Sequence, residues 1–523
     1  MQTLVTADEM RWCDEKTIRT IGIPAIVLME NAGGNVARFI LNSFGPLRGK
    51  NVIVFSGKGN NGGDGFVIAR HLSQNGARVF AVLLAPPAEL KGDAKSNFAI
   101  LQRIARLSKE AVSILRFRKE TLRLLPRPDI IVDAIFGTGF SSPAKGVFAE
   151  AIGWINAQAV PRIAVDVPSG VNGTTGIAEG PAVKATVTTT LGLPKTGLFC
   201  NDARDHTGKI VTLDIGIPAA VVESGSFKTF LVESSDISPL LPRRPSTAHK
   251  YSTGKVFVLA GSRGYTGAAA LCAKAALRTG AGAVVLGTPD SVYPILARKL
   301  TEAIIEPLPS TLDGSLSFTS LEKIKKRLSW ADVIVIGPGL SRHEETQRLI
   351  QTIVLESRFR VLVDADALFA LAAAGVSKVR KSRAELILTP HVGEYARFVG
   401  KRTREIEQKR IEESRSGAES LGKILVLKGA PTITATPEGG LYLNSTGNPG
   451  MATVGAGDVL SGIIGSLWAQ GMKAEEAART GVYLHGLSGD LAAKSIGMRS
   501  LIAQDMIDFL PHAFHATEAG EAT

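Results

Sequence analysis

The chain has 523 residues, which favours two large domains because a single hydrophobic core stops growing at about 250–300 residues. Hydrophobic residues make up 45% and charged residues 21%, which excludes a disordered chain and a fibrous fold. The net charge of +12 would suit nucleic acid, but the densest charged stretch, 401–415, alternates in sign and lacks interleaved aromatic residues. We therefore expect a solvated helix there, no nucleic-acid partner, and small ligands that bear phosphate.

The cysteines and the apolar runs indicate the cellular compartment. Cys13, Cys200 and Cys272 lie far apart without a CxxC spacing, which argues against zinc and disulfides, so we expect free core thiols. The first residues contain no apolar signal segment, and the longest apolar runs are shorter than a membrane span. We expect a cytoplasmic protein with no membrane partner.

From Asn51 onward, short β-branched runs alternate with amphipathic stretches such as 64–75, which predicts a parallel sheet with helices on both faces. The pattern breaks at 237–251, where prolines, serines and basic residues indicate a connection. A second alternating series follows, with a helical segment at 267–279. The sequence thus predicts an α/β domain over 1–220, a linker over 221–250, a second α/β domain over 251–511 and a frayed tail over 512–523.

A glycine-rich loop, Ser56 to Gly65 (SGKGNNGGDG), leaves one predicted strand and enters a predicted helix. Such a loop lets the backbone approach a phosphate at a helix N-terminus. The next predicted strand ends without the acid that a dinucleotide-binding dehydrogenase needs, and the loop lacks the lysine and serine of a Walker A loop. The loop adds polar side chains at Asn60, Asn61 and Asp64. The alternative is a tight turn without a ligand.

Two further predicted strands end in polar residues. Asp133 ends one of them, and Asp166 with Ser169 follows another. A lone buried aspartate is usually structural, but two at the carboxyl ends of parallel strands favour a ligand site. Amide and hydroxyl oxygens with a single carboxylate also suit a hard, weakly bound cation.

Four segments of this first half, LMENAGGNVA, GKGNNGGDGFVIAR, DAIFGTGF and DVPSGVNG, resemble the successive motifs of the NAD(P)HX epimerase family over about the first 215 residues. The resemblance implies a Rossmann-like three-layer αβα sandwich, with Asp166 as the catalytic residue at the reacting ring and potassium held by Asn61, Asp133 and Ser169. It also implies that the hydrated dinucleotide contacts Asn60, Asn61, Gly62, Gly63, Asp64, Gly137, Thr138, Gly139, Phe140, Ser141, Ser142, Pro143 and Asp166. The same domain type occurs as a noncatalytic scaffold in RNA-decapping proteins, but every polar position is retained here.

The second half contains the segment Asn448 to Gly462, NPGMATVGAGDVLSG. Gly455 and Gly457 would expose backbone N–H groups at the start of an apolar helix, where they stabilise phosphoryl charge, while Asp458 can accept a proton from a hydroxyl. This arrangement is typical of phosphoryl transfer onto an alcohol. An aspartate cap after a glycine turn is the alternative, but it would not account for both glycines.

The GAGD sequence resembles ribokinase-like α/β domains. The segments HKYSTGK, GSRGYTGAA, GPGL, VDADAL, TPHVGE and KGAPT follow the order typical of NAD(P)HX dehydratases within that class. The resemblance implies that the hydrate contacts Ala268, Gly339, His391 and the catalytic Asp458. The adenine nucleotide would contact Lys428, Gly429, Ala430, Pro431, Thr432 and Gly457.

Three positions of the second domain bear on nucleotide and metal binding. The family usually reads TGGSGD where this chain reads TVGAGD, so Val454 and Ala456 replace a glycine and a serine, and we expect a changed nucleotide affinity or preference. Glu394 is a candidate to orient water around magnesium, and a surface carboxylate is the alternative.

Together the resemblances imply epimerisation of R- and S-NADHX and NADPHX, then dehydration of the S epimer with ADP or ATP. Potassium and magnesium would be cofactors, and we expect a homo-oligomer. One alternative is a ribokinase-like kinase of a small alcohol with a regulatory N-terminal domain, but TPHVGE and HKYSTGK speak against it. Another makes the first domain a binding or scaffolding module, with RNA as one candidate ligand.

Overall fold

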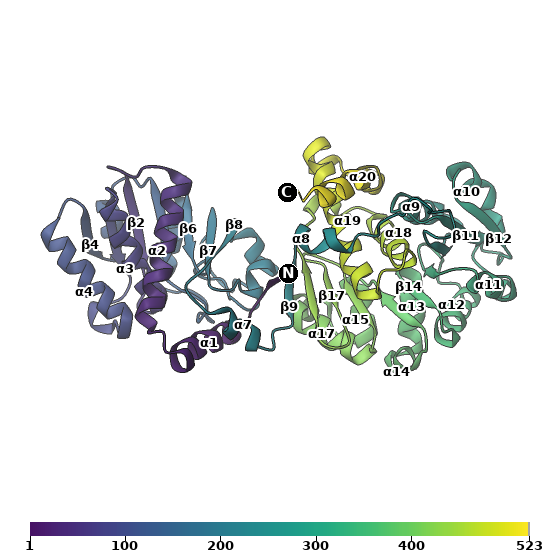
Figure 1. Cartoon of the computed structure of the whole chain (residues 1–523), viewed down its shortest axis with the longest axis horizontal. Coiled ribbons are helices and arrows are strands. Elements are labelled where there is room, and N and C mark those ends of the chain that lie inside the picture. Colours follow the sequence, from purple (N-terminus) through teal and green to yellow (C-terminus); the bar gives the residue numbers. More distant parts are fainter. Residues whose placement is uncertain (521–523) are drawn as a thin grey trace. The chain divides into compact units, whose positions relative to one another are not determined.

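The computed structural model describes residues 1–520, which fold into two compact units. The N-terminal unit is Thr3–Phe227, and the C-terminal unit comprises Met1–Gln2 and the chain from Lys228 onward (Figure 1). Each unit is a sheet covered by helices, so the prediction of two α/β domains is confirmed.

The sheet of the N-terminal unit has the order β4-β3-β2-β5-β6-β7-β8, and every neighbouring pair in it is parallel. Its strands are β2 (Asn51–Ser56), β3 (Arg78–Leu83), β4 (Val112–Arg116), β5 (Ile130–Ala134), β6 (Arg162–Val165), β7 (Val187–Leu191) and β8 (Lys209–Leu213). The chain builds outward in one direction from β2 and in the other from β5. The loops after β2 and β5 therefore diverge at a switch point, where α/β sheets bind ligands.

Alternate residues of each central strand face opposite layers, as the two-residue period of a strand requires. In β2, Val52 and Val54 belong to one buried cluster, and Ile53 and Phe55 belong to another. The first cluster packs under α2 (Ala25–Phe44), α3 (Asn60–Gln74) and α4 (Gly92–Leu107), and the second under α6 (Val147–Ala157). The unit is thus the three-layer sandwich that the sequence predicts. Its other helices are α1 (Ala7–Lys16), α5 (Thr121–Leu124) and α7 (Ala219–Ser224).

The sheet of the C-terminal unit has the order β1-β9-β18-β17-β16-β15-β14-β13-β10-β11-β12. From β16 to β12 all pairs are parallel, whereas β17 is antiparallel to both of its neighbours. Its strands are β1 (Gln2–Thr3), β9 (Thr229–Val232), β10 (Lys255–Leu259), β11 (Ala283–Pro289), β12 (Ile304–Leu308), β13 (Val333–Ile336), β14 (Arg360–Val363), β15 (Glu385–Leu388), β16 (Ile424–Leu427), β17 (Ile433–Ala435) and β18 (Leu441–Asn444).

The largest core of this unit lies between the sheet and four helices, α9 (Thr266–Arg278), α18 (Ala456–Ala469), α19 (Ala474–Ile496) and α20 (Ala503–Ala519). Trp468 is completely buried there. The remaining helices are α8 (Ser234–Ile237), α10 (Tyr293–Lys299), α11 (Leu321–Leu328), α12 (Glu344–Glu356), α13 (Ala365–Ala374), α14 (Val376–Lys381), α15 (Val392–Val399), α16 (Thr403–Gln408) and α17 (Arg410–Leu421).

The linker and the tail, which the sequence predicts to be irregular, contain regular secondary structure. The expected linker, 221–250, contains most of α7 together with β9 and α8, because Leu231 and Val232 are buried in the second sheet. The expected frayed tail continues α20 as far as Ala519, with Gly520 as its C-cap, because Ala513 and Thr517 are buried. Residues 521–523 of that tail lie outside the described residues. Within residues 1–520, no helix has both the length and the apolar character needed to cross a bilayer.

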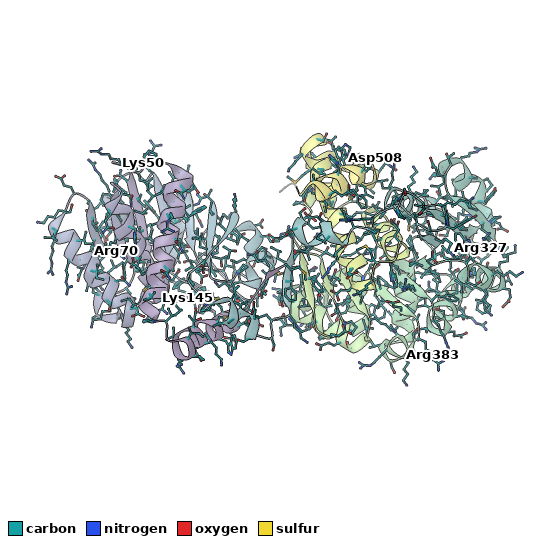
Figure 2. The ribbon with its side chains drawn as sticks, viewed as in Figure 1. Lys50, Arg70, Lys145, Arg327, Arg383 and Asp508 are labelled. Atoms are coloured by element: carbon teal, nitrogen blue, oxygen red, sulfur yellow. The ribbon has the colours of Figure 1, made fainter. Side chains whose placement is uncertain are left out.

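The charged stretch 401–415 is not one solvated helix, and that prediction is wrong. Lys409 separates α16 from α17, and the Arg410 side chain is 1% exposed although its partner Glu407 is half exposed. Elsewhere charged side chains project from both units, as Lys145, Arg383 and Asp508 illustrate (Figure 2). Cys13, Cys200 and Cys272 are buried free thiols, as expected.

The contact of α3 with the sheet gives a stability prediction. A Cβ atom at Gly65 would lie 2.6 Å from Ser56 Oγ and 2.8 Å from Ala134 Cβ, so Gly65→Ala should destabilise the N-terminal unit by about 1–3 kcal/mol. A Cβ atom at Gly153 in α6 would have no neighbouring atom within 4 Å, and Gly153→Ala should stabilise by about 0.5–1 kcal/mol. Hydrogen exchange of the N-terminal unit would measure both changes. Equal protection in the two variants would contradict the prediction.

Candidate functional site

The loops after β2 and β5 meet at the switch point of the N-terminal sheet. The Asn61 side chain, in the first turn of α3, donates a hydrogen bond from Nδ2 to the Phe136 carbonyl at 2.8 Å. Its other polar atom, Oδ1, is buried and has no hydrogen-bond partner among residues 1–520. A buried oxygen without a donor is costly, so its surroundings favour a bound cation or water.

Asp133 and Ser169 lie beside this amide. Ser169 donates from Oγ to Asp133 Oδ1 at 2.6 Å and from its backbone N–H to Oδ2 at 2.8 Å. The Ser169 hydroxyl also accepts from the Phe136 N–H at 2.9 Å, which links it to the Asn61 loop. Burial raises the pKa of Asp133 to about 6, although the hydrogen bonds from Ser169 and Ile135 oppose this shift. The three residues expected to hold potassium are therefore brought together.

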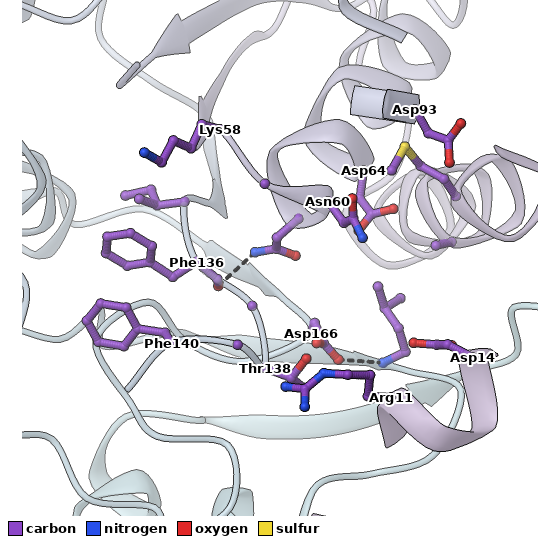
Figure 3. A pocket seen from close by; sticks show the side chains of 18 of the residues that line it. Arg11, Asp14, Lys58, Asn60, Asp64, Asp93, Phe136, Thr138, Phe140 and Asp166 are labelled. Atoms are coloured by element: carbon purple, nitrogen blue, oxygen red, sulfur yellow. Dashed lines mark hydrogen bonds between the residues drawn. The ribbon is translucent and has the colours of Figure 1, made fainter. Parts of the chain in front are cut away.

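A cavity of about 750 Å³ opens between these loops and α1 (Figure 3). Of the residues expected to contact the hydrate, those that line it are Asn60, Asn61, Asp64, Gly137, Thr138, Gly139, Phe140 and Asp166. Gly62 and Gly63 instead face inward, since a Cβ there would overlap the Gly57 carbonyl or the Met29 side chain. Ser141, Ser142 and Pro143 do not line the cavity.

Asp166 directly follows β6 and has a backbone φ of +69°, a conformation uncommon for residues other than glycine. Its Oδ1 accepts hydrogen bonds from Lys195 Nζ at 2.5 Å and from the Leu191 N–H at 3.2 Å. Strained backbone of this kind is concentrated at functional sites, where surrounding contacts over-determine it.

Lys195 and Asp14 also line the cavity, and sequence reasoning missed both. The Lys195 side chain is 1% exposed, and its ammonium group donates to the Leu191 carbonyl at 2.7 Å besides Asp166. Its position shortly after the predicted strand at β7 was an available signal. Asp14 lies on α1, remote in sequence from the other motifs, so no local pattern indicated it.

In the C-terminal unit, parts of four motifs that resemble the dehydratase family follow the neighbouring parallel strands β13, β14, β15 and β16. They are Gly337–Leu340, Asp364–Asp366, Thr389–His391 and Lys428–Thr432. The carboxyl ends of parallel strands share one edge of a sheet, so these segments converge there.

An ion pair lies at the centre of this edge. Lys428 Nζ is 2.7 Å from Asp364 Oδ1, and the Ser461 hydroxyl of α18 donates to Asp364 Oδ2 at 2.7 Å. A Cβ at Gly457 would lie 3.2 Å from Lys428 Nζ, so glycine lets the N-terminus of α18 approach the pair closely. Asp364 belongs to the VDADAL segment, but sequence reasoning did not assign it a role.

Asp458 lies in the first turn of α18. Burial raises the pKa of Asp458 to about 7, and Asp364 adds to the rise while Lys428 opposes it. Burial also raises the pKa of Glu394, against Lys428, which lowers it. For Lys428 burial alone would lower the pKa, but Asp364 and Glu394 keep it above its ordinary value. Asp458 is thus a carboxyl group that titrates near neutral pH, as a general base requires.

The other expected hydrate contacts lie around the same edge. A Cβ at Gly339 would lie 3.2 Å from Ala268 Cβ, so these two residues are adjacent. His391 is the N-cap of α15, and its Nδ1 accepts from the Gly393 N–H at 2.9 Å, while Glu394 Oε2 accepts from the His391 N–H at 2.8 Å. Glu394 is therefore a half-buried cap partner rather than a surface carboxylate.

Arg410 supports the segment expected to hold the nucleotide, and the sequence analysis placed it in solvent. Its Nη2 donates to the carbonyls of Leu427, Lys428 and Pro431 at 2.9–3.4 Å. The buried guanidinium therefore fixes the backbone on both sides of Gly429. The role of Arg410 is visible only in the folded structure, because in the sequence this residue belongs to a stretch of alternating charges.

Comparison with known proteins identifies two family models along the chain. The model described as YjeF-related protein N-terminus matches residues 25–197, and the model described as NAD(P)H-hydrate dehydratase matches residues 256–512. The first covers the cavity of the N-terminal unit except for Ile215 and the lining residues that precede Ala25, and the second covers the whole edge around Lys428.

Similar proteins span both units. A "Bifunctional NAD(P)H-hydrate repair enzyme Nnr" from Moorella thermoacetica is 43% identical over 516 residues, which are 98% of this chain and 97% of that protein. Among solved structures, an ADP/ATP-dependent NAD(P)H-hydrate dehydratase from Bacillus subtilis, co-crystallized with ATP/Mg2+, is 31% identical with a TM-score of 0.47, covering 55% of this chain and 98% of that one. A ribokinase-like superfamily protein from Enterococcus faecalis is 26% identical with a TM-score of 0.49, covering 55% and 96%. On the full-length match, this chain belongs to the family of bifunctional NAD(P)H-hydrate repair enzymes.

Proposed function

We propose that this chain repairs hydrated nicotinamide cofactors with one activity in each unit. The N-terminal unit interconverts the R and S epimers of NADHX and NADPHX. The C-terminal unit dehydrates the S epimer to NADH or NADPH and consumes ADP or ATP. The observation that carries the proposal is the full-length similarity to a bifunctional repair enzyme, with a separate family model matching each unit.

The chemistry explains why a kinase-like site serves a repair reaction. The hydrate carries a hydroxyl on the ring carbon beside nitrogen, and hydroxide is a poor leaving group. Transfer of a phosphoryl group converts the hydroxyl into a phosphate ester, which then eliminates. A dehydratase site shaped for one epimer cannot use the other. The epimerase converts the unused epimer into the usable one, so that both can be repaired.

In the N-terminal unit, we assign Asp166 as a catalytic residue at the reacting ring. The support is its place on the cavity wall, its ion pair with Lys195 and its strained backbone. The hydrate would contact Asn60 to Asp64 and Gly137 to Pro143, with the inward-facing glycines contributing through their backbone.

Potassium would bind beside this cavity through Asn61, Asp133 and Ser169. The buried Asn61 Oδ1 without a hydrogen-bond donor among residues 1–520 fits such an ion, and a single carboxylate suits its single charge. Bound there, potassium would neutralise the carboxylate and fix the two loops of the switch point.

In the C-terminal unit, Asp458 would accept the proton of the hydrate hydroxyl as that oxygen attacks the terminal phosphate. The N–H groups at the start of α18 and the Lys428 ammonium would stabilise the transferred phosphoryl charge. The remaining contacts are Ala268, Gly339 and His391 for the hydrate, and Gly457 with Lys428 to Thr432 for the nucleotide.

Magnesium would enter this site together with the nucleotide. Among residues 1–520 no group of three or more His, Cys, Asp or Glu side chains is arranged to hold a metal. Magnesium fits such a site because it is commonly held by one or two carboxylates together with phosphate oxygens and water. Glu394, held half-buried by the His391 N–H, would orient a water molecule of that ion.

Two further expectations accompany this function. Free buried cysteines suit a reducing compartment, so we place the enzyme in the cytoplasm. A homo-oligomer stays a prediction, which sedimentation analysis of the purified chain would check.

The epimerase assignment is tested with Asp166→Asn. This change keeps the shape, tolerates the positive φ and retains an oxygen that can accept from the Lys195 ammonium, whereas alanine would remove that hydrogen bond as well as the charge. Wild type given mixed epimers and ATP should recover nearly all cofactor absorbance. The variant should recover only the absorbance that corresponds to the S epimer, apart from what spontaneous epimerisation supplies. Asp508→Asn, an exposed change, is the control. Full recovery by Asp166→Asn would refute the assignment and favour a binding module.

The potassium assignment is tested on Asp166→Asn, which should bind the R epimer without converting it. Replacing potassium by tetramethylammonium at equal ionic strength should weaken this binding, because the larger cation does not fit among the Asn61, Asp133 and Ser169 oxygens. Calorimetry gives the affinity, and adding Ser169→Ala should remove the dependence on potassium. Equal affinity in both salts would remove the ion from the site.

The dehydratase assignment is tested with Asp458→Asn, which keeps the shape but cannot take a proton. Loss of a general base should lower the rate about a hundred- to ten-thousand-fold, whereas loss of a helix cap would cost about 1 kcal/mol of stability. The base must be deprotonated and burial raises its pKa to about 7, so wild-type kcat/KM should fall as the pH drops below about 7. Recovery within a few-fold of wild type at all pH values would make Asp458 a structural cap.

A further inference from the structure

The cavity of the N-terminal unit contains more acids than its one buried cation can pair with. Asp14, Asp64 and Asp166 line it together with Lys195, whose ammonium is hydrogen-bonded to Asp166. Figure 3 shows the Asp14 carboxyl beside this ion pair, on the side of the cavity formed by α1. No hydrogen bond to the Asp14 side chain is found in the described part of the chain, so this group is available to a ligand.

The surroundings of Asp14 favour its protonated form. Burial raises its pKa to about 6, Lys195 opposes this and Asp166 adds to it. Burial, with Asp166 and Asp14, also raises the pKa of Asp64 well above its usual range. Asp64, however, is a buried residue of α3 and only 7% exposed. The charged groups around Asp14 are Asp64, Asp166 and Lys195 from other elements, Glu9 and Arg11 on its own helix, and Lys58, Glu89 and Asp93 farther along the cavity wall.

We propose that Asp14 is a second catalytic residue of the epimerase site and donates the proton that releases the hydrate hydroxyl. The inference rests on the proposed function. The juxtaposition that carries it is an unpaired carboxyl group beside the Lys195–Asp166 pair, inside a cavity large enough for a small-molecule ligand. Asp166, whose ionised form is stabilised by the ion pair with Lys195, is the proton acceptor.

The step balances without another reagent. The Asp14 carboxylic acid protonates the hydroxyl, the C–O bond breaks, and water leaves with the bonding electrons. The ring nitrogen lone pair forms a C=N bond, which makes the carbon planar. Water then adds to the opposite face, the C=N electrons return to nitrogen, and the proton that this water loses passes to the Asp166 carboxylate. Exchange with solvent restores the starting protonation of both carboxyl groups.

The test measures epimerisation without nucleotide, so that the C-terminal unit cannot act, by separating the epimers and subtracting the spontaneous rate. Asp14→Asn in the full chain should lower kcat by at least about a hundred-fold. Wild-type kcat/KM should fall as the pH rises above about 6, because the acid must stay protonated, and the variant should lose this limb. Asp14→Glu should restore part of the rate. Glu15→Gln, an exposed change on the same helix, should leave it unchanged.

The outcomes separate the two proposals. A wild-type chain that does not interconvert the epimers overturns the proposed function itself. If wild type is active but Asp14→Asn keeps its kcat and the same pH limb, or loses only affinity, the inference about Asp14 is wrong. Dehydration of the S epimer with ATP and unchanged hydrogen exchange of α1 show that the variant is folded, so that a lost rate then supports the inference.

Discussion

In both units, a single lysine ammonium faces a surplus of carboxyl groups at the carboxyl edge of a parallel sheet. Lys195 is paired with Asp166 beside Asp14 and Asp64, and Lys428 is paired with Asp364 beside Asp458 and Glu394. One ammonium can neutralise one carboxylate, so the others remain in a poorly hydrated site where the neutral form is favoured. This imbalance, rather than any one residue, supplies groups that exchange protons near neutral pH.

The sheets create this condition because parallel strands place every loop that follows them on one edge. Adjacent residues of one strand, such as Val54 and Phe55, are buried on opposite faces of the sheet, so helices must cover both faces. Polar groups can then reach solvent at the edge where the strands end. Strain is concentrated there as well, as the positive φ of Asp166 illustrates. Each fold therefore positions its chemistry by topology.

The strands and the strand-end acids were predictable, because β-branched runs and glycine turns are local signals. Asp133, Asp166 and Asp458 were identified from such patterns. Lys195, Asp14 and Asp364 were missed, since their importance comes from partners that are brought close only by folding. Arg410 was misassigned for a related reason: alternating charges predict a solvated face, but the break at Lys409 turns this one side chain beneath a loop. The short strands β17 and β18 likewise depend on tertiary pairing, because each lies between two neighbouring strands of the sheet.

The packing of Arg410 against Gly429 has a consequence for how this sequence can vary. A Cβ at Gly429 would lie 2.5 Å from Arg410 Nη2, and the glycine has a φ of +149°, so the guanidinium occupies the space of a side chain. Any residue larger than glycine at 429 would displace the Arg410 guanidinium, and the carbonyls of Leu427, Lys428 and Pro431 would then need another donor. The two positions are thus expected to covary as a pair across related chains, although they lie nineteen positions apart in the sequence.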